Sequence, residues 1–237
     1  AVTASVNTNL TENKVNAVID ESTIRDADKV SVKSESNKKA STLASGIAVS
    51  GGAGVNGLVI VNQNETENNA KITNSTIKTK NDVKVEGKSS FKTFDALASA
   101  GVSTVAVNAA AISNIAANKN TASIENTNIS ESGSVTVNAE STNDIKGNNI
   151  SLGVGGGAIG LSALVNLVES ETKAFINNSD PSKIIKTAAL NVKANDSINL
   201  DMNVGVLTAG GVSAAGAANV NIINNAVLAE IKSQSEI

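Results

Sequence analysis

Residues 164–176 read Leu-Val-Asn-Leu-Val-Glu-Ser-Glu-Thr-Lys-Ala-Phe-Ile, and this stretch decides the fold because its pattern recurs along the whole chain. In each copy an Asn is followed eight residues later by Ala, and two residues after that by Ile. Copies lie 52 to 55 residues apart, which defines a repeat of about 52 residues. The repeated Asn residues are Asn9, Asn62, Asn114, Asn166 and Asn221.

Further aliphatic positions recur at fixed distances from this Asn. An Ile follows the Ala-x-Ile element, and an aliphatic-x-Val pair begins six residues after that Ile. Such short alternating patterns of β-branched residues are typical of β-strands. The recurring positions are predicted to be structural and to form aliphatic ladders inside the fold: Ile24, Ile77, Ile129 and Ile184, followed by Val32, Val85, Val137 and Val192.

One insertion interrupts the regular spacing. It lies between Ala174 and Ile184 and contains Asp180-Pro181-Ser182, with the only Pro of the chain. Proline cannot donate a hydrogen bond to a strand ladder, so this insertion is predicted to be a surface loop.

The repeat predicts an all-β solenoid that forms a single domain over residues 1–237. Long uncharged stretches such as Gly46–Gln63, Ala96–Asn118 and Ser151–Val168 are interpreted as buried strands with glycine corners. We expect two coils per repeat, or three shorter ones, and a body ~45–60 Å long at ~4.8 Å per coil. A β-propeller and an α/β repeat are less favoured, because aromatic blade signatures and a sustained helical stripe are both absent.

The recurring Asn has two possible roles. Stacked amides can hydrogen-bond along a solenoid axis if equivalent residues lie one coil apart. If they lie further apart, a side chain that bonds to the backbone in a turn is the alternative. The sequence leaves both roles open.

Composition excludes several classes of chemistry. The chain has no Cys and no His, so thiolate and imidazole metal sites, disulfides and His-based catalysis are absent. The net charge is −3 and Arg25 is the only arginine, which gives no basic footprint for nucleic acid. We therefore expect no enzymatic activity, catalytic residue, cofactor or metal site.

Three features imitate functional motifs. The segments Gly52–Gly57 and Gly155–Gly160 match G-x-G-x-x-G, but no amphipathic helix follows either, so glycine corners are the better interpretation. The carboxylates between Asp20 and Asp28 around Arg25 are interpreted as a solvated loop, although such groups serve polysaccharide-cleaving β-helices. The uncharged stretches, including Met202–Ala229, are long enough to suggest membrane spans, but buried solenoid interior is favoured over membrane insertion.

The chain resembles the leukotoxin-type filamentous adhesin family, the haemagglutinin-like proteins exported by two-partner secretion. The resemblance lies in Ser162-Ala163-Leu164-Val165-Asn166 leading to Thr172-Lys173-Ala174-Phe175-Ile176, and in Ala217-Ala218-Asn219-Val220-Asn221 leading to Asn225-Ala226-Val227-Leu228-Ala229. It implies a right-handed parallel β-helix on the bacterial surface or secreted from the cell, with a virulence role in host-cell adhesion or as a toxin. No functional residue can be transferred from the family.

The sequence thus favours a non-catalytic shaft segment of an adhesin or leukotoxin that binds an unidentified host-cell surface component. The alternatives are a polysaccharide-processing β-helix enzyme and a membrane-active toxin segment. We also expect end-to-end self-association through the terminal coils, around Ala1–Leu10 and Leu228–Ile237, because a solenoid presents unpaired strand edges at its ends.

Overall fold

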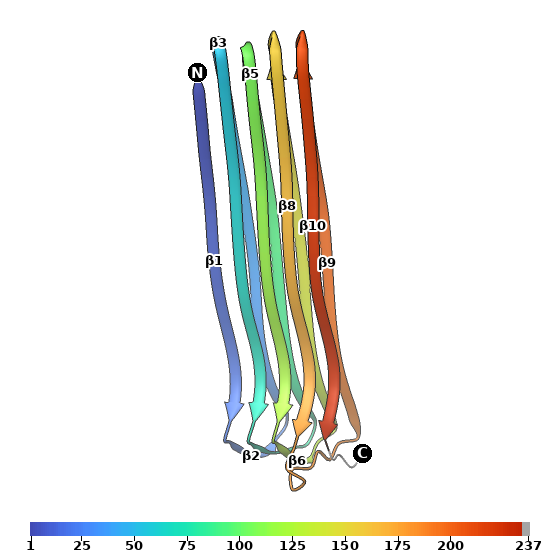
Figure 1. The fold of residues 1–237 in the computed structure, drawn as a ribbon. Coiled ribbons are helices and arrows are strands. Elements are labelled where there is room, and N and C mark those ends of the chain that lie inside the picture. The colour runs from blue at the N-terminus through green and yellow to red at the C-terminus, as the bar shows by residue number, and fades with distance from the viewer. Residues whose placement is uncertain (234–237) are drawn as a thin grey trace.

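The computed structural model describes residues 1–233, which form an all-β structure with no helix (Figure 1). All strand pairs are parallel, as in a parallel β-helix or β-solenoid, and this confirms the predicted fold class. The strands are β1 (Val2–Asp20), β2 (Thr23–Ala27), β3 (Val30–Thr73), β4 (Thr76–Thr79), β5 (Asp82–Glu125), β6 (Asn128–Glu131), β7 (Ser134–Val154), β8 (Gly157–Asn178), β9 (Ala189–Ala209) and β10 (Val212–Ser233).

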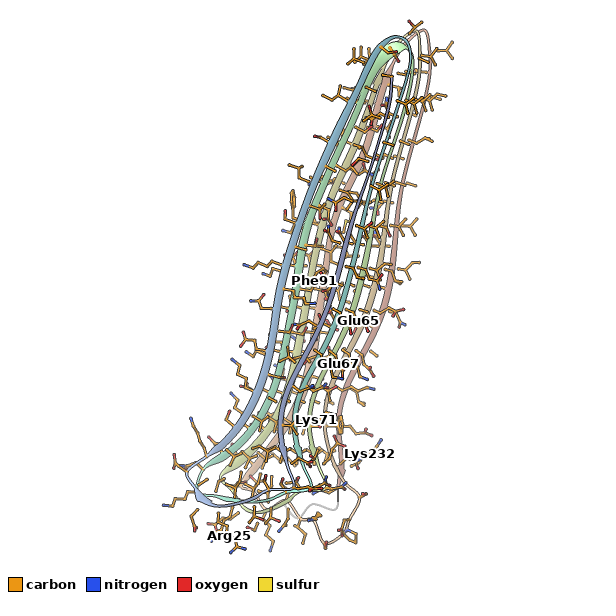
Figure 2. The ribbon with its side chains drawn as sticks, turned by 90° about the vertical axis from the view of Figure 1, so that its left-hand side faces the viewer. Arg25, Glu65, Glu67, Lys71, Phe91 and Lys232 are labelled. Carbon is orange, nitrogen blue, oxygen red and sulfur yellow. The ribbon has the colours of Figure 1, made fainter. Side chains whose placement is uncertain are left out.

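Each repeat forms one coil. Strand β3 rises from Val30 to Ser50, turns at Gly51 and Gly52, and descends from Ala53 to Thr73 (Figures 1 and 2). The rising layer contains the first half of β3, the first half of β5, and β7 and β9. The descending layer contains β1, the second halves of β3 and β5, and β8 and β10.

The expectation of two coils per repeat was therefore wrong. Ile72 and Ile124 face the same interior wall, as expected, but they are direct partners on neighbouring strands. Their spacing is one strand separation, ~4.8 Å, rather than the ~10 Å of two coils. The sequence misled because many inward positions carry Asn, Ser or Thr, which hides the alternation of long strands and makes them look like several short ones.

The long dimension of the molecule follows the strands. A leg such as β7 contains 21 residues and spans ~70 Å at ~3.3 Å per residue. The stack of coils measures only ~20 Å at the usual strand spacing. The predicted body of 45–60 Å along the coil axis is thus also wrong: the molecule is a thin blade whose two layers separate at the base (Figure 2).

Short strands close the base of the blade. Strands β2, β4 and β6 form a separate sheet between the descending and rising legs. The corner before this sheet uses a left-handed backbone conformation at Glu21, Asn74 and Asn126, with φ of 46°, 49° and 47°. Asn is one of the few non-glycine residues that adopt this conformation readily, which explains its recurrence there.

The core changes along the blade. At the base, between three layers, Val and Ile ladders form the largest apolar cluster, which includes Val85, Ile72 and Ile77. Higher up, where only two layers face each other, smaller clusters form around Leu58 and Ile112 and around Phe91 and Ile145. Buried Asn, Ser and Thr fill the remaining interior positions.

Two irregular regions match the sequence prediction. Residues 179–183 leave the regular body as a surface loop, in which Asp180 accepts hydrogen bonds from the backbone N–H and hydroxyl of Ser182. Gly51–Gly52 and Gly155–Gly156 lie at the tip of the blade, where the chain reverses. No helix follows either glycine motif, so both are turns rather than nucleotide-binding loops.

Candidate functional site: an apolar face above a charged base

The five recurring Asn residues form one continuous chain of hydrogen bonds across the coils. Each side-chain Nδ2 donates to Oδ1 of the Asn in the next coil. The four distances are 2.8, 2.9, 2.9 and 2.7 Å from the Asn9 end to the Asn221 end. Because the repeat equals one coil, the amides touch, and the ladder role rather than the turn role applies.

A buried carboxylate that the sequence analysis missed lies opposite this ladder. Asp95 is fully buried on the rising layer, and Thr93 donates to its Oδ2 at 3.1 Å, while Oδ1 has no hydrogen-bond partner. Burial raises the pKa of this carboxyl, and hydrogen bonds from Thr93, Thr42 and the Asn ladder oppose the shift. The sequence contained a signal for this group. Asp95, between Phe94 and Ala96, is the one charged residue among the inward positions of the rising half of β5.

The predicted aliphatic positions line the base of the blade. Ile24, Ile77 and Ile129 are partners in the short base sheet, and Val32, Val85, Val137 and Val192 are partners in the rising layer. The fourth Ile position requires a correction: Ile129 bridges to Ile185, which is fully buried, whereas Ile184 is only half-buried. The loop that precedes it shifts the register by one residue.

The acidic group around Arg25 does not converge on a cleft. Arg25 lies at the base of the first coil, on the outside (Figure 2). Asp20 accepts hydrogen bonds from Thr73 Oγ1 at 2.5 Å and Asn74 Nδ2 at 3.1 Å, which hold the pKa of this carboxyl below its usual range. Within residues 1–233, no cluster of Asp and Glu has the arrangement of a metal site.

The lower part of the blade, the charged base, carries rows of alternating charge on its outer surface. On the descending layer the row runs Lys14, Glu67, Lys119, Glu171, and Lys14 Nζ lies 2.8 Å from Glu67 Oε2. On the rising layer Lys88 lies between Glu35 and Glu140. Opposite charges on neighbouring coils favour the observed register.

A shallow groove of about 500 Å³ crosses the descending layer at this level. Glu65 and Glu169 lie on either side of the groove, because the residue between them on the intervening strand is the small Ala117. Lys119 lies below them, and Figure 2 labels Glu65 and Glu67. Its lining is polar and of mixed charge, which suits contacts with a charged or hydroxyl-rich surface.

The upper part of the blade, the tip half, presents an apolar surface. The uncharged stretches were expected to be buried, but the structure buries only every second residue. The intervening side chains project outward and are exposed, for example Leu161 at 53% and Ile222 at 53%. We call the outward positions of the descending layer the apolar face; they belong to residues 2–10, 55–63, 107–115, 159–167 and 214–222.

The apolar face is nearly free of polar side chains, which interrupt it only at Thr8, Gln63 and Ser113. Two neighbouring rows of mostly small residues run across the strands and leave a groove of about 470 Å³. One row contains Gly57, Ala109, Leu161 and Gly216, and the other contains Ala111, Ala163 and Ala218.

Comparisons with known proteins identify no relative. No family model, no curated protein sequence and no solved structure matches this chain. Among residues 1–233 there is also no helix of the length and hydropathy needed to cross a membrane.

Proposed function

We propose that this chain is a non-catalytic shaft segment of a large bacterial adhesin or leukotoxin, secreted or held at the cell surface, that binds a host-cell surface component. The observation that carries the proposal is the uninterrupted set of ladders. The Asn chain and the base Val ladder pass through successive coils with the same register.

Such a stack supports a shaft role because neighbouring coils satisfy one another. Repeats that contact only their neighbours can be added without changing the fold, so length and reach are set by the number of coils. The edge strands at the two ends, β1 and the rising half of β3 at one end and β9 and β10 at the other, carry backbone groups that a further coil could pair.

The charged base supports a binding role. Its rows place Lys, Glu, Asn, Ser and Thr at regular spacing along both outer surfaces, and each row is shared by several coils. A surface of this kind makes many weak polar contacts, and their sum over a long shaft produces useful avidity. Glu65 and Glu169 border the groove on either side of Ala117, but both are exposed to solvent instead of buried in a site that would tune one of them as an acid, which favours binding over acid–base catalysis.

Binding of the purified, labelled chain to cultured epithelial cells and leukocytes tests this proposal. Saturable binding that weakens as salt is raised is expected, because exposed charges are screened. A variant with Lys84, Lys88 and Lys92 changed to Gln removes cations from the rising layer, and a matched variant with Lys14, Lys71 and Lys119 changed to Gln removes them from the descending layer. At least one should lose binding severalfold.

Two results would contradict the proposal. One is the absence of saturable binding to any host cell. The other is turnover of a polysaccharide by the purified chain, which would point instead to a carbohydrate-processing β-helix.

A further inference from the structure

We infer that the apolar face is a self-association surface, on which a second copy of this chain packs face to face to form a closed dimer. This inference concerns the tip half and is independent of the host-cell binding proposed for the charged base.

The size of the face matches a stable interface. Five strands at ~4.8 Å and about ten residues at ~3.3 Å give a surface of roughly 800 Å². That is the area each partner contributes to a standard protein–protein interface. It also exceeds the ~300–600 Å² of the largest apolar patch on a typical monomer.

The relief of the face suits another sheet. The groove along Gly57, Ala109 and Gly216 extends over the neighbouring row, in which Ala111, Ala163 and Ala218 follow Val59, and the row of Val55, Val107 and Ile159 forms a ridge beside it. A Cβ added at Gly57 would meet no atom within 4 Å, so the groove is open to a side chain from outside. Two sheets packed ~10 Å apart interdigitate such rows, as they do inside β-sandwiches.

The charges indicate how the copies would be arranged. An acidic row with Glu12, Glu65 and Glu169 borders the lower edge of the face. In a parallel pair this row would oppose its own copy. In an antiparallel pair each acidic row lies beside the partner's tip, because Glu65 and Ala53 are equally far along the strand from the central residue Val59. The acidic groups then stay in water.

A lipid surface is the less suitable occupant. The rising surface of the tip half also exposes aliphatic side chains, such as Leu43, Ile47 and Leu207, but it has four strands instead of five, and Ser45, Asn148 and Asn203 interrupt it. The acidic row with Glu12, Glu65 and Glu169 at the edge of the face would also be repelled by anionic lipid headgroups. A second copy requires only the one face.

Ala111 is the residue that tests the inference most sharply. It lies on the middle strand and the middle row of the face, where a twofold axis brings it close to its own copy. The matched control is Ala98, an exposed Ala on the rising surface of the same strand β5.

The experiment is sedimentation velocity of the full chain between about 1 and 100 µM, with Ala111→Lys and Ala98→Lys. We expect wild type and Ala98→Lys to form dimers and Ala111→Lys to associate at least about 100-fold more weakly, because a charge would be buried without a partner. Circular dichroism melting shows whether each variant folds.

A second readout does not depend on a destabilising change. The chain has no Cys, so Ala111→Cys introduces a single thiol, and mild oxidation should convert it into a covalent dimer while Ala98→Cys stays monomeric. The inference is overturned if wild type is monomeric throughout this range, if it floats with lipid vesicles as a monomer, or if Ala98→Lys disrupts assembly equally. Open-ended assemblies that persist in Ala111→Lys would also overturn it, since they would show edge pairing through the end coils.

Discussion

The base and the tip of the blade are built on the same strand alternation but differ in the residues that their interiors and exteriors carry. At the base, the interior is a three-sided Val and Ile core, and the exterior is charged. At the tip, Asn, Gly, Ser and Ala occupy much of the narrow interior, and the exterior is aliphatic. The difference shows that strand alternation in an apolar stretch does not by itself identify the buried side, because at the tip aliphatic residues such as Leu164 and Val165 lie on opposite sides of the same strand.

The largest expected effect contrasts the same substitution in the two regions. Val137→Asp places a carboxylate inside the base core, where Val137 is fully buried, and should destabilise the fold by about 3–5 kcal/mol. Val165→Asp changes an outward residue of the tip, 40% exposed, and should cost less than about 1 kcal/mol. Urea unfolding of dilute protein measures both, and equal losses would mean that the interior of the base is assigned wrongly.

The Asn ladder provides the next contrast, between the middle and the end of the stack. Asn114→Ala leaves the Nδ2 of Asn62 without its acceptor and the Oδ1 of Asn166 without its donor, so a loss of about 2–3 kcal/mol is expected. Asn9→Ala removes a half-buried terminal member and should cost about 1 kcal/mol. Urea midpoints that rank the two variants in the opposite order would argue against a continuous amide chain.

Within the tip, one glycine lies in the closely packed interior and another lies on the open outer surface. A Cβ at Gly101 would lie 2.6 Å from Oδ1 of Asn108, so Gly101→Ala should cost about 1–2 kcal/mol through overpacking. Gly57→Ala points outward into open space and should be neutral or stabilise the strand by about 0.5 kcal/mol. Thermal melting of the two variants tests whether the tip interior is closely packed. Similar shifts in melting temperature for both would contradict this packing.

Asp95, between the two regions, should make stability depend on pH. Its pKa is raised above the ordinary 3.8, so the folded state holds the proton more tightly than the unfolded state. Stability is therefore lost as pH rises from about 4 through the raised value. Asp95→Asn should unfold at higher urea than wild type at pH 7 and at the same urea at pH 3. A gap that is constant with pH would show that ionisation of Asp95 is not its source.

Much of the fold could be predicted from the sequence because the repeat is strict. The spacing of Asn62 and Asn114 identified equivalent positions, and Pro181 located the surface loop. The coil length could not be read, because polar inward residues such as Asn68 and Ser34 interrupt the hydrophobic alternation expected of a long strand. The exposed tip was missed for a related reason: an uncharged stretch looks buried until the opposite layer is known.

The predicted end-to-end association stays a prediction. The N-terminal coil presents β1 as a free edge, as expected, whereas residues 234–237 of the other end lie outside the described residues. The dimer inferred for the apolar face is closed, so its stoichiometry distinguishes it from assemblies that grow through these edges.

The central claim is that one repeat makes one coil, and a disulfide test addresses it directly. Lys92 and Asp144 are one repeat apart, face outward, and are direct partners in the rising layer. The double variant Lys92→Cys/Asp144→Cys should form an intramolecular disulfide, because neighbouring strands place the two Cα atoms ~5 Å apart, within the range of such bonds. Lys92→Cys/Lys146→Cys moves one thiol two residues along the strand, to ~8 Å, and should remain reduced. If the first pair stays reduced in folded protein, or both pairs oxidise equally, equivalent residues are not on adjacent coils and the one-coil repeat is wrong.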